Sequence, residues 1–396
     1  CSLKAVDLDP AEDHAAQAAH VLRELSMMAG RREAGYPGGK RTIFRTEAAS
    51  TEPPLEQGLQ AGPDWVVVAS GGARGITAEC LRTLAPSGCR LVLLGRSPAP
   101  APEAQALRGL DVPGLRAHYL SEARAAGGKP RPADIERAVQ AHLARRDMEQ
   151  NLRDLAALGA RVDYRAVDVC DGRAVQELLS GVLKDYQRID MVVHGAGLIE
   201  DTVFEKKTPA SFDRVFDTKA GSAVALIEAA RNPALKAVCF FTSVAGRYGN
   251  PGQADYAAAN ETLNFYARAL KRGSLRDCRV KAINWGPWDA TTTGAGMVTD
   301  STRAQFLSRG IGMVEPVPGR EYFWREMFWA DPDQVETAAW VADGETMEAR
   351  VCALPADPEA APSAKGLLLL DGARRVGEHT LSWRFDMVSA PYTDDH

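Results

Sequence analysis

The sequence is short of cysteine pairs, metal-ligand patterns and long apolar runs. Its seven cysteines show neither the CxxC nor the Cys/His spacing of a zinc site, and they lie at positions 1, 80, 89, 170, 239, 278 and 352. An odd and scattered set argues against a disulfide framework and favours a reducing compartment, so we expect a cytoplasmic protein without a metal site. No apolar run approaches the ~20 residues of a membrane helix, and we expect no membrane contact.

A strong excess of one charge sign is also missing. The net charge is -5, and charged residues make up 25% of the 396 residues. This mildly acidic balance argues weakly against a nucleic-acid partner. Hydrophobic residues, at 45%, are ample for a buried core. The length fits two or three domains, or one large α/β unit with extensions.

What the sequence does contain is a regular alternation of apolar, strand-like runs with helical segments. The expected strands span residues 65–69, 90–94, 161–167, 189–194, 237–243 and 279–285. Expected helices fall between the later strands, at 173–186, 208–230 and 253–271. Because strand-helix-strand repeats form right-handed crossovers, the pattern predicts a doubly wound parallel (Rossmann-type) α/β sheet with strands covered on both faces.

Composition changes along the chain predict its division into parts. We expect an N-terminal segment at 1–47, a linker at 48–63, the α/β unit at 64–345 and a tail at 346–396. Within the unit, a Pro-rich and charged insertion at about 98–151 leads into a helix over about 135–155, and a Gly- and Thr-rich stretch at about 291–318 is a candidate lid.

The N-terminal segment is expected to begin in mid-element, because the first residue is Cys1 and the chain opens without a signal-peptide pattern. We therefore expect a piece excised from a longer protein. Asp9, with Pro10 after it, is the expected cap of a first helix, followed by a turn at 35–39 and an edge strand at 41–45.

A glycine-rich turn directly follows the first expected strand. Its residues are Ser70, Gly71, Gly72, Arg74, Gly75 and Ile76. Glycines at this point let the backbone approach a pyrophosphate, and the N-terminus of the following helix presents amide donors. The third-glycine position of the usual fingerprint is either filled by Thr77 or bypassed. We predict a dinucleotide site at this non-standard turn.

The ends of the next strands supply the other expected contacts with a dinucleotide. The second strand is followed by Arg96-Ser97, where an NAD site has an acid for the ribose hydroxyls. An arginine suits a 2′-phosphate instead, and Arg74 could reach the same group, so we predict NADPH rather than NADH. The expected contacts further along are Asp168 and Val169 for the adenine, and His194, Gly195, Ala196 and Gly197 for the nicotinamide ribose.

Four polar residues form a candidate catalytic group for reduction of a ketone. The alkoxide needs a proton, and the phenol of Tyr256, with a pKa near ~10, needs a nearby cation such as Lys219. Ser243 can hydrogen-bond the carbonyl oxygen, and Asn260, one helical turn after the tyrosine, can hold a water or a backbone carbonyl. Each residue alone has an ordinary role as core, cap or solvated side chain, but their combination on a dinucleotide edge favours catalysis.

Residues 65–342 resemble the short-chain dehydrogenase/reductase superfamily, and more closely the ketoreductase domains of type I polyketide and polyunsaturated-fatty-acid synthases. The typical superfamily enzyme carries Tyr-x-x-x-Lys, whereas this chain has Tyr256-x-x-x-Asn260 with the lysine at 219, as the synthase domains have. The resemblance implies that Tyr256 is the proton donor, Ser243 the carbonyl binder, Lys219 the pKa modulator and Asn260 their support. It also places Pro287, in Asn284-Trp-Gly-Pro-Trp288, beside the nicotinamide.

The resemblance further implies a substrate and partners. These are a 3-ketoacyl group on the phosphopantetheine of an acyl carrier protein domain, and the neighbouring synthase domains. The insertion resembles that of iterative, polyunsaturated-fatty-acid-type synthases, residues 1–45 the end of a structural subdomain, and residues 390–396 the opening of a dehydratase domain. Asp201 and Tyr248 lie where such domains control stereochemistry, which implies a D (usually R) 3-hydroxy product.

Two other interpretations stay open from the sequence. One is a catalytically silent ketoreductase-like domain that only scaffolds a synthase, against which the complete set of four catalytic residues argues. The other is a stand-alone reductase or epimerase acting on a sugar, a steroid or another carbonyl substrate, against which the missing Tyr-x-x-x-Lys argues.

Overall fold

A computed structural model of the chain describes residues 4–27, 33–44, 46–47, 58–127, 131–289, 300–342, 374–377 and 380–382. The chain divides into two units. The larger comprises Thr51–Ala342, and the smaller comprises Cys1–Ser50 together with Asp343–His396. None of the helices that the structure describes is long and apolar enough to cross a membrane.

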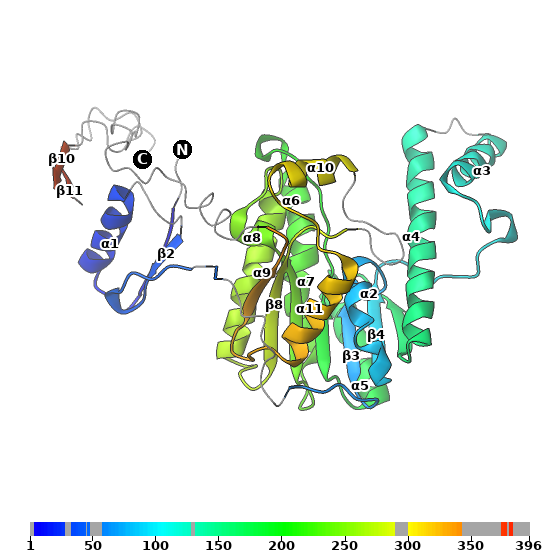
Figure 1. Ribbon diagram of the computed structural model, residues 1–396, viewed down its shortest axis with the longest axis horizontal. Helices are drawn as coiled ribbons and strands as arrows, with labels where there is room; N and C mark the ends of the chain where they lie inside the picture. The colour runs from blue at the N-terminus through cyan, green and yellow to red at the C-terminus, as the bar shows by residue number, and fades with distance from the viewer. Residues whose placement is uncertain are drawn as a thin grey trace. The chain divides into compact units, whose positions relative to one another are not determined.

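The apolar runs of the larger unit form one parallel sheet (Figure 1). Its order among the described strands is β5-β4-β3-β6-β7-β8-β9. The bounds are β3 Val66–Ser70, β4 Arg90–Gly95, β5 Arg161–Ala166, β6 Met191–His194, β7 Ala237–Ser243, β8 Arg279–Trp285 and β9 Glu336–Ala339. All neighbouring strands are parallel, so the predicted doubly wound sheet is confirmed. The sequence did not predict β9, because Glu-Thr-Ala-Ala carries little apolar signal.

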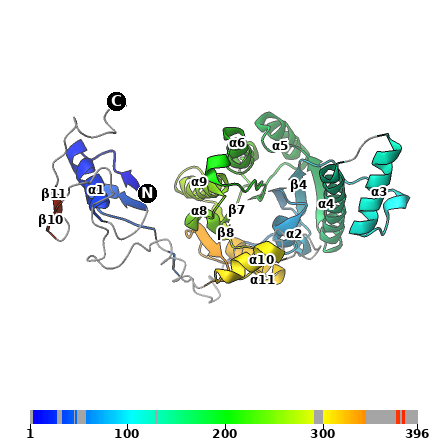
Figure 2. The ribbon, with the colours of Figure 1, turned by 90° about the horizontal axis from the view of Figure 1, so that it is seen from above.

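Helices cover both faces of this sheet (Figure 2). Because successive strand side chains point to opposite faces, Val67 and Ala69 pack into one apolar cluster and Val66 and Val68 into another. The first cluster is completed by α2 (Gly75–Leu81), α4 (Pro132–Ala157) and α11 (Pro316–Phe328). The second is completed by α5 (Gly172–Tyr186), α7 (Ser222–Ala230) and α9 (Ala254–Arg272). The other α-helices that the structure describes in this unit are α3 (Val112–Ala125), α6 (Pro209–Phe216), α8 (Val244–Tyr248) and α10 (Asp300–Ser308).

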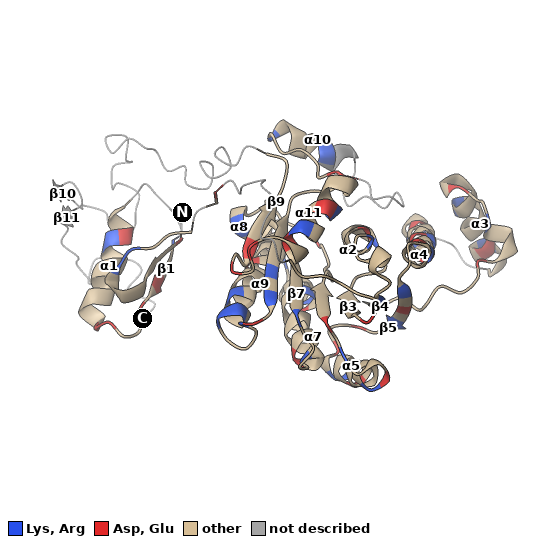
Figure 3. Cartoon of the chain, turned by 60° about the horizontal axis from the view of Figure 1, so that its bottom comes forward, with Lys and Arg blue, Asp and Glu red and all other residues tan. Residues whose placement is uncertain are grey.

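The predicted insertion lies in the crossover between β4 and β5. Helix α3, which the sequence did not predict, packs on α4 at the outer edge of the unit (Figures 1 and 2). The C-terminal half of α4 belongs to the core, since Met148 and Leu155 lie in it. Nearer its start, His142 is buried between Glu103 and the Tyr119 hydroxyl, at 2.5 and 3.0 Å. Acidic and basic residues are interspersed along these helices (Figure 3).

The described part of the predicted lid contains one whole helix and the start of a second. Residues 291–299 lie outside the described residues, and α10 follows at Asp300–Ser308. Helix α11 begins at Pro316, inside the predicted lid, but it belongs to the core: Phe323 is fully buried, and Gly319 leaves room for the Trp288 ring. The last residues of the expected lid therefore start a core helix.

The N-terminal part of the smaller unit is a strand-helix-strand motif. Strands β1 (Ala5–Leu8) and β2 (Glu33–Tyr36) pair in parallel, with α1 (His14–Ser26) between them. The predicted cap at Asp9 is wrong, because Pro10 falls in a turn before the helix and Asp13 accepts from Ala16 N instead. The predicted edge strand at 41–45 is also wrong, since only a single bridge, Gly35 to Thr42, is formed there.

A buried carboxylate holds this motif together. Glu24 is 1% exposed and accepts from Tyr36 Oη at 2.8 Å, Arg41 Nε at 2.5 Å and Lys4 Nζ at 3.1 Å. Burial raises the pKa of Glu24, but hydrogen bonds from these three groups outweigh it and lower the pKa to about 2. Elsewhere in this unit, β10 (Arg374–Gly377) and β11 (Thr380–Ser382) form an antiparallel hairpin. The dehydratase-like end at 390–396 and residues 48–57 of the expected linker lie outside the described residues.

Candidate active site

The candidate site lies at the carboxyl edge of the sheet, where the strand order reverses. From β3 the chain proceeds to β4 and β5 on one side, and from β6 to β7, β8 and β9 on the other. Ser70 and His194, the last residues of β3 and β6, are paired across this point. Open α/β sheets bind ligands in the crevice outside such a switch point.

The glycine-rich turn after β3 has the close packing that a dinucleotide site requires. Gly71 has a φ of +67°, and a Cβ there would lie 3.0 Å from the Gly195 carbonyl oxygen. A Cβ on Gly72 would lie 2.8 Å from the Ala69 Cβ. Gly75, with a φ of +58°, has open space around it. A left-handed, side-chain-free backbone beside open space fits the approach of a phosphate.

Thr77 explains why the fingerprint departs from the usual form. The side chain is buried, and a Cβ on Gly195 would overlap its hydroxyl. The threonine thus fills the space that a residue larger than glycine would need at 195.

The two predicted arginines have different surroundings. Arg96 is exposed just beyond β4, and this strand end adjoins the glycine turn because Gly71 N donates to the Leu94 carbonyl at 2.9 Å. Arg74 is ion-paired through Nε to Asp147 of α4 at 3.2 Å. Both arginines are exposed, and Arg74 is in addition held by α4.

The other predicted cofactor residues border the same edge. Ser97 accepts from Tyr164 Oη at 2.6 Å through its carbonyl, and Asp168 is exposed while Val169 is buried. Ile76 is half-buried in the first turn of α2. The Pro287 carbonyl, after β8, accepts from Val314 N at 2.8 Å.

The imidazole of His194 is fully enclosed and links three segments. Its Nε2 donates to the Lys219 carbonyl at 2.8 Å, and its Nδ1 therefore accepts from Ser70 Oγ, also at 2.8 Å. Ser70 Oγ in turn accepts from Ala196 N at 3.3 Å. Burial, and then the charge of Lys219, lower the pKa of His194 to about 3. The side chain is therefore closed off from any ligand at this edge, and it fixes the backbone position of Lys219.

Lys219 lies in a π-helical turn, Asp217–Gly221, between α6 and α7. The predicted helix over 208–230 is thus present as α6, this π turn and α7, and the sequence did not predict the π turn. Such single π turns are frequent at functional sites. The lysine side chain is buried, burial lowers its pKa to about 8, and a Cβ on Gly197 would lie 3.3 Å from its Nζ. Glycine at 197 keeps space in front of the ammonium group.

The four predicted catalytic residues come together. Lys219 Nζ lies 5.7 Å from the centroid of the Tyr256 ring. Burial raises the pKa of the Tyr256 phenol, and hydrogen bonding to Ser243 and Asn260 offsets only part of the increase. Ser243 also caps α8, accepting from Ala245 N at 3.1 Å. Asn260 Nδ2 donates to the Tyr256 carbonyl at 2.6 Å, while its buried Oδ1 has no partner among the described residues.

The two residues expected to control stereochemistry have defined partners. The Tyr248 ring stacks on Trp340, with centroids 4.8 Å apart and planes at 13°. Asp201 accepts two hydrogen bonds from Gln253 Nε2, at 3.0 and 2.9 Å. Sequence reasoning missed a third feature of this region, a buried ion pair between Lys207 and Asp255. Residues 48 positions apart leave no local pattern that could have revealed it.

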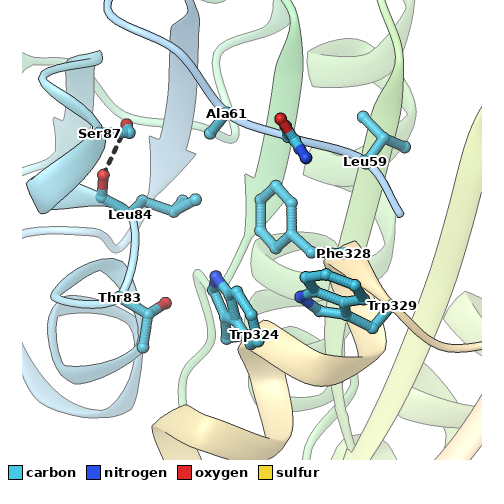
Figure 4. A pocket seen from close by; sticks show the side chains of 9 residues that line it. Leu59, Ala61, Thr83, Leu84, Ser87, Trp324, Phe328 and Trp329 are labelled. Carbon is cyan, nitrogen blue, oxygen red and sulfur yellow. Dashed lines mark hydrogen bonds between the residues drawn. The ribbon is translucent and has the colours of Figure 1, made fainter. Parts of the chain in front are cut away.

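A pocket of about 290 Å³ lies away from this group (Figure 4). Its lining includes Leu59 and Ala61, which precede β3, and Trp324 and Phe328 of α11. These residues adjoin the amino ends of the strands, so the pocket is separate from the candidate active site. Within the described parts of the chain, no group of three or more His, Cys, Asp or Glu side chains is arranged to hold a metal ion.

The sequence of this chain is similar to those of known proteins. Residues 135–290 match the model of the KR domain family. The chain is 33% identical over 336 residues to one subunit of the polyunsaturated fatty acid synthase of Thraustochytrium sp., covering 81% of this chain and 11% of that protein. The chain contains a KR domain. The synthase relatives are much longer, so the KR chain spans only about a tenth of the Thraustochytrium protein.

Solved structures share the fold of this KR domain. A ketoreductase domain from the bacillaene assembly line superimposes with a TM-score of 0.66 at 22% identity, covering 88% of this chain and 72% of that one. A putative dehydrogenase from Burkholderia cenocepacia with bound NADP gives a TM-score of 0.50 at 18% identity, covering 71% of this chain and 93% of that one. At these identities the likeness concerns the Rossmann-type fold.

Proposed function

We propose that the chain is an NADPH-dependent ketoreductase that converts a 3-ketoacyl thioester into the 3-hydroxyacyl thioester. The substrate is carried on the phosphopantetheine of an acyl carrier protein domain, within a cytoplasmic polyketide or fatty-acid-like synthase whose other domains are its neighbours. The convergence of Lys219, Ser243 and Tyr256 carries this proposal. The synthase relatives support the substrate class.

The glycine turn and Arg96 suit NADPH as the cofactor, which would supply the hydride when bound. The turn of Ser70–Ile76 would hold the pyrophosphate, because its glycines leave the backbone accessible. Arg96 would bind the 2′-phosphate, Asp168 and Val169 would border the adenine, and Gly195–Gly197 and Pro287 the nicotinamide ribose.

Each catalytic residue has a defined task in this proposal. Ser243 holds the ketone oxygen, and Tyr256 donates its phenolic proton to that oxygen as charge develops. The buried Lys219 ammonium stabilises the phenolate left behind, and Asn260 holds the backbone at Tyr256. Asp201 and Tyr248 flank the substrate side, and we propose a D (R) hydroxyl.

Tyr256→Phe tests this proposal. The full chain should oxidise NADPH in the presence of a 3-ketoacyl N-acetylcysteamine thioester, followed at 340 nm. Loss of the proton donor should lower kcat by about 10²–10⁴-fold, with the fold retained by circular dichroism. Tyr266→Phe, the same change ten positions further along α9, should leave kcat within about twofold.

A wild-type chain that binds NADPH but turns over no ketoacyl thioester would instead support the scaffold alternative. Turnover confined to a sugar or steroid ketone would support the stand-alone reductase.

A further inference from the structure

A loop beside the candidate active site is fastened to the helix that carries Tyr256. This 199–207 loop follows β6 and precedes α6. Thr202 N donates to the Gly252 carbonyl at 3.0 Å, and Asp201 accepts from Gln253 Nε2. Gln253 is the N-cap residue of α9, so both contacts reach the start of that helix.

The most buried of these contacts is an ion pair. Lys207 Nζ lies 2.6 Å from Asp255 Oδ2, and the two side chains are 3% and 1% exposed. The same ammonium group donates to the Glu200 carbonyl at 2.9 Å, while the other Asp255 oxygen accepts from Tyr256 N at 2.8 Å. One lysine thus connects the far end of the loop to its beginning and to the backbone of the proton donor.

The beginning of the loop is also held from α6. The Glu200 carboxylate accepts from Ser211 Oγ at 2.6 Å and pairs with Arg214 at 2.8 Å. The backbone is therefore fixed from two sides, although Ile199, Val203 and Phe204 expose 43%, 52% and 73% of their surface.

Stability alone is a poor explanation for a buried ion pair at this place. Taking two charges out of water costs several kcal/mol each, and well-packed apolar replacements are often as stable or more so. What the pair supplies is a fixed geometry between the loop and Tyr256.

We propose that Lys207 and Asp255 are positioning residues whose ion pair holds the 199–207 loop against Tyr256 and thereby selects the face of the ketone that is reduced. This inference rests on the proposed ketone reduction. The loop carries Asp201, which Gln253 joins to the start of α9, three residues before Tyr256, so its position bears on the space beside the proton donor.

The test uses the full chain with Lys207→Met/Asp255→Leu, which removes both charges and leaves neither partner buried alone. Displacement of reacting groups by about 1 Å can cost ~10²-fold in rate. We expect kcat to fall by about 10- to 100-fold and the ratio of R to S product to change by about tenfold or more, with Kd for NADPH within about threefold. Unchanged kcat and product ratio in the folded variant would overturn the proposal.

A matched control is another buried lysine-carboxylate pair in the described part of this domain. Lys281 Nζ lies 3.2 Å from Glu326 Oε2, with side chains 0% and 5% exposed, and joins β8 to α11. Lys281→Met/Glu326→Leu is a similar change in a similar environment, and it should alter stability without altering the product ratio. A comparable change of ratio in this control would show that the effect comes from general loosening of the fold.

Two further measurements keep the outcome decisive. Asp255→Asn keeps an acceptor for Lys207 and should shift the product ratio in the same direction but less. If the double variant does not fold, an unchanged product ratio in Asp255→Asn overturns the proposal.

Hydrogen exchange of residues 200–207, including Thr202 N, should become about tenfold faster in the variants. Because exchange needs no turnover, unchanged exchange defeats the positioning role, whereas an inactive wild type defeats the proposed function.

Discussion

The ammonium group of Lys219 is buried, and burial lowers its pKa to about 8. The phenol of Tyr256 has a raised pKa and stays protonated through this range. As the pH rises through about 8, the lysine loses the charge that would stabilise the phenolate, so kcat/KM for ketone reduction should fall. A pH-rate profile between about pH 6 and 10 would measure this fall in kcat/KM.

The buried lysine also affects stability. The folded state releases the Lys219 proton at a lower pH than the unfolded chain does, so the contribution of Lys219 to the free energy of unfolding rises with pH between about 8 and 10.5.

Lys219→Arg identifies the group responsible for the alkaline limb. A guanidinium remains charged throughout, so the limb should move beyond the measured range even if the rate at pH 7 is lower. A limb that stays near pH 8 in this variant would belong to another group.

Arg96 decides between the two nicotinamide cofactors in the proposed site. It is exposed beside the glycine turn, whereas Arg74 is ion-paired to Asp147. Arg96→Ala should raise KM for NADPH by more than about tenfold and leave KM for NADH within about twofold, because only NADPH carries the 2′-phosphate. Arg173→Ala, on the exposed surface of α5, is the control. An equal increase of KM for both cofactors would mean that the 2′-phosphate binds elsewhere.

His194 connects three secondary-structure elements, since it belongs to β6 and bonds to Ser70 of β3 and to the π turn at Lys219. His194→Leu leaves two buried polar groups without their partner and should lower the free energy of unfolding by about 2–4 kcal/mol. Urea unfolding at pH 7 would measure this.

The same histidine predicts a pH dependence of stability. Its folded pKa is about 3, below its ordinary value of 6.5, so the unfolded chain takes up the proton first as the pH falls below about 6.5. The wild type should therefore lose stability between pH 7 and pH 4.5, and His194→Leu should lose less. If the wild type and His194→Leu lost the same free energy of unfolding over this pH range, the imidazole would not be enclosed and neutral.

The strands of the larger unit other than β9 could be predicted, because most of them are short apolar runs that end in a polar or glycine turn. Observed strand β7 begins and ends at the predicted residues, Ala237 and Ser243. The π turn at Asp217–Gly221 could not be predicted, because one wider turn leaves the apolar periodicity of 208–230 almost unchanged. The pairing of Lys207 with Asp255 could not be predicted either, since it depends on tertiary contact between distant segments.

In the candidate site too, residue types could be predicted from local sequence, whereas the contacts between distant segments could not. The glycines and Tyr256 can be predicted because they follow an expected strand or open an expected helix, and Lys219 because a phenol that donates a proton needs a nearby cation. The links that hold them, such as Ser70 to His194 and Asp201 to Gln253, arise only when the sheet brings those ends together.

Both apolar clusters of the described structure draw their members from residues 59 to 339 only. The smaller unit instead has its own buried centre around Glu24. The sheet, the glycine turn and the catalytic group therefore depend on packing within one unit. A fragment of residues 58–342 should unfold within about 2 °C of the main transition of the full chain, since a loss of even 1 kcal/mol would shift Tm by about 2–4 °C in a domain of this size. Calorimetry of the two proteins, with NADPH binding measured in parallel, would test this. A fragment that lacks the transition, or that melts about 10 °C lower, would mean that flanking residues complete its core.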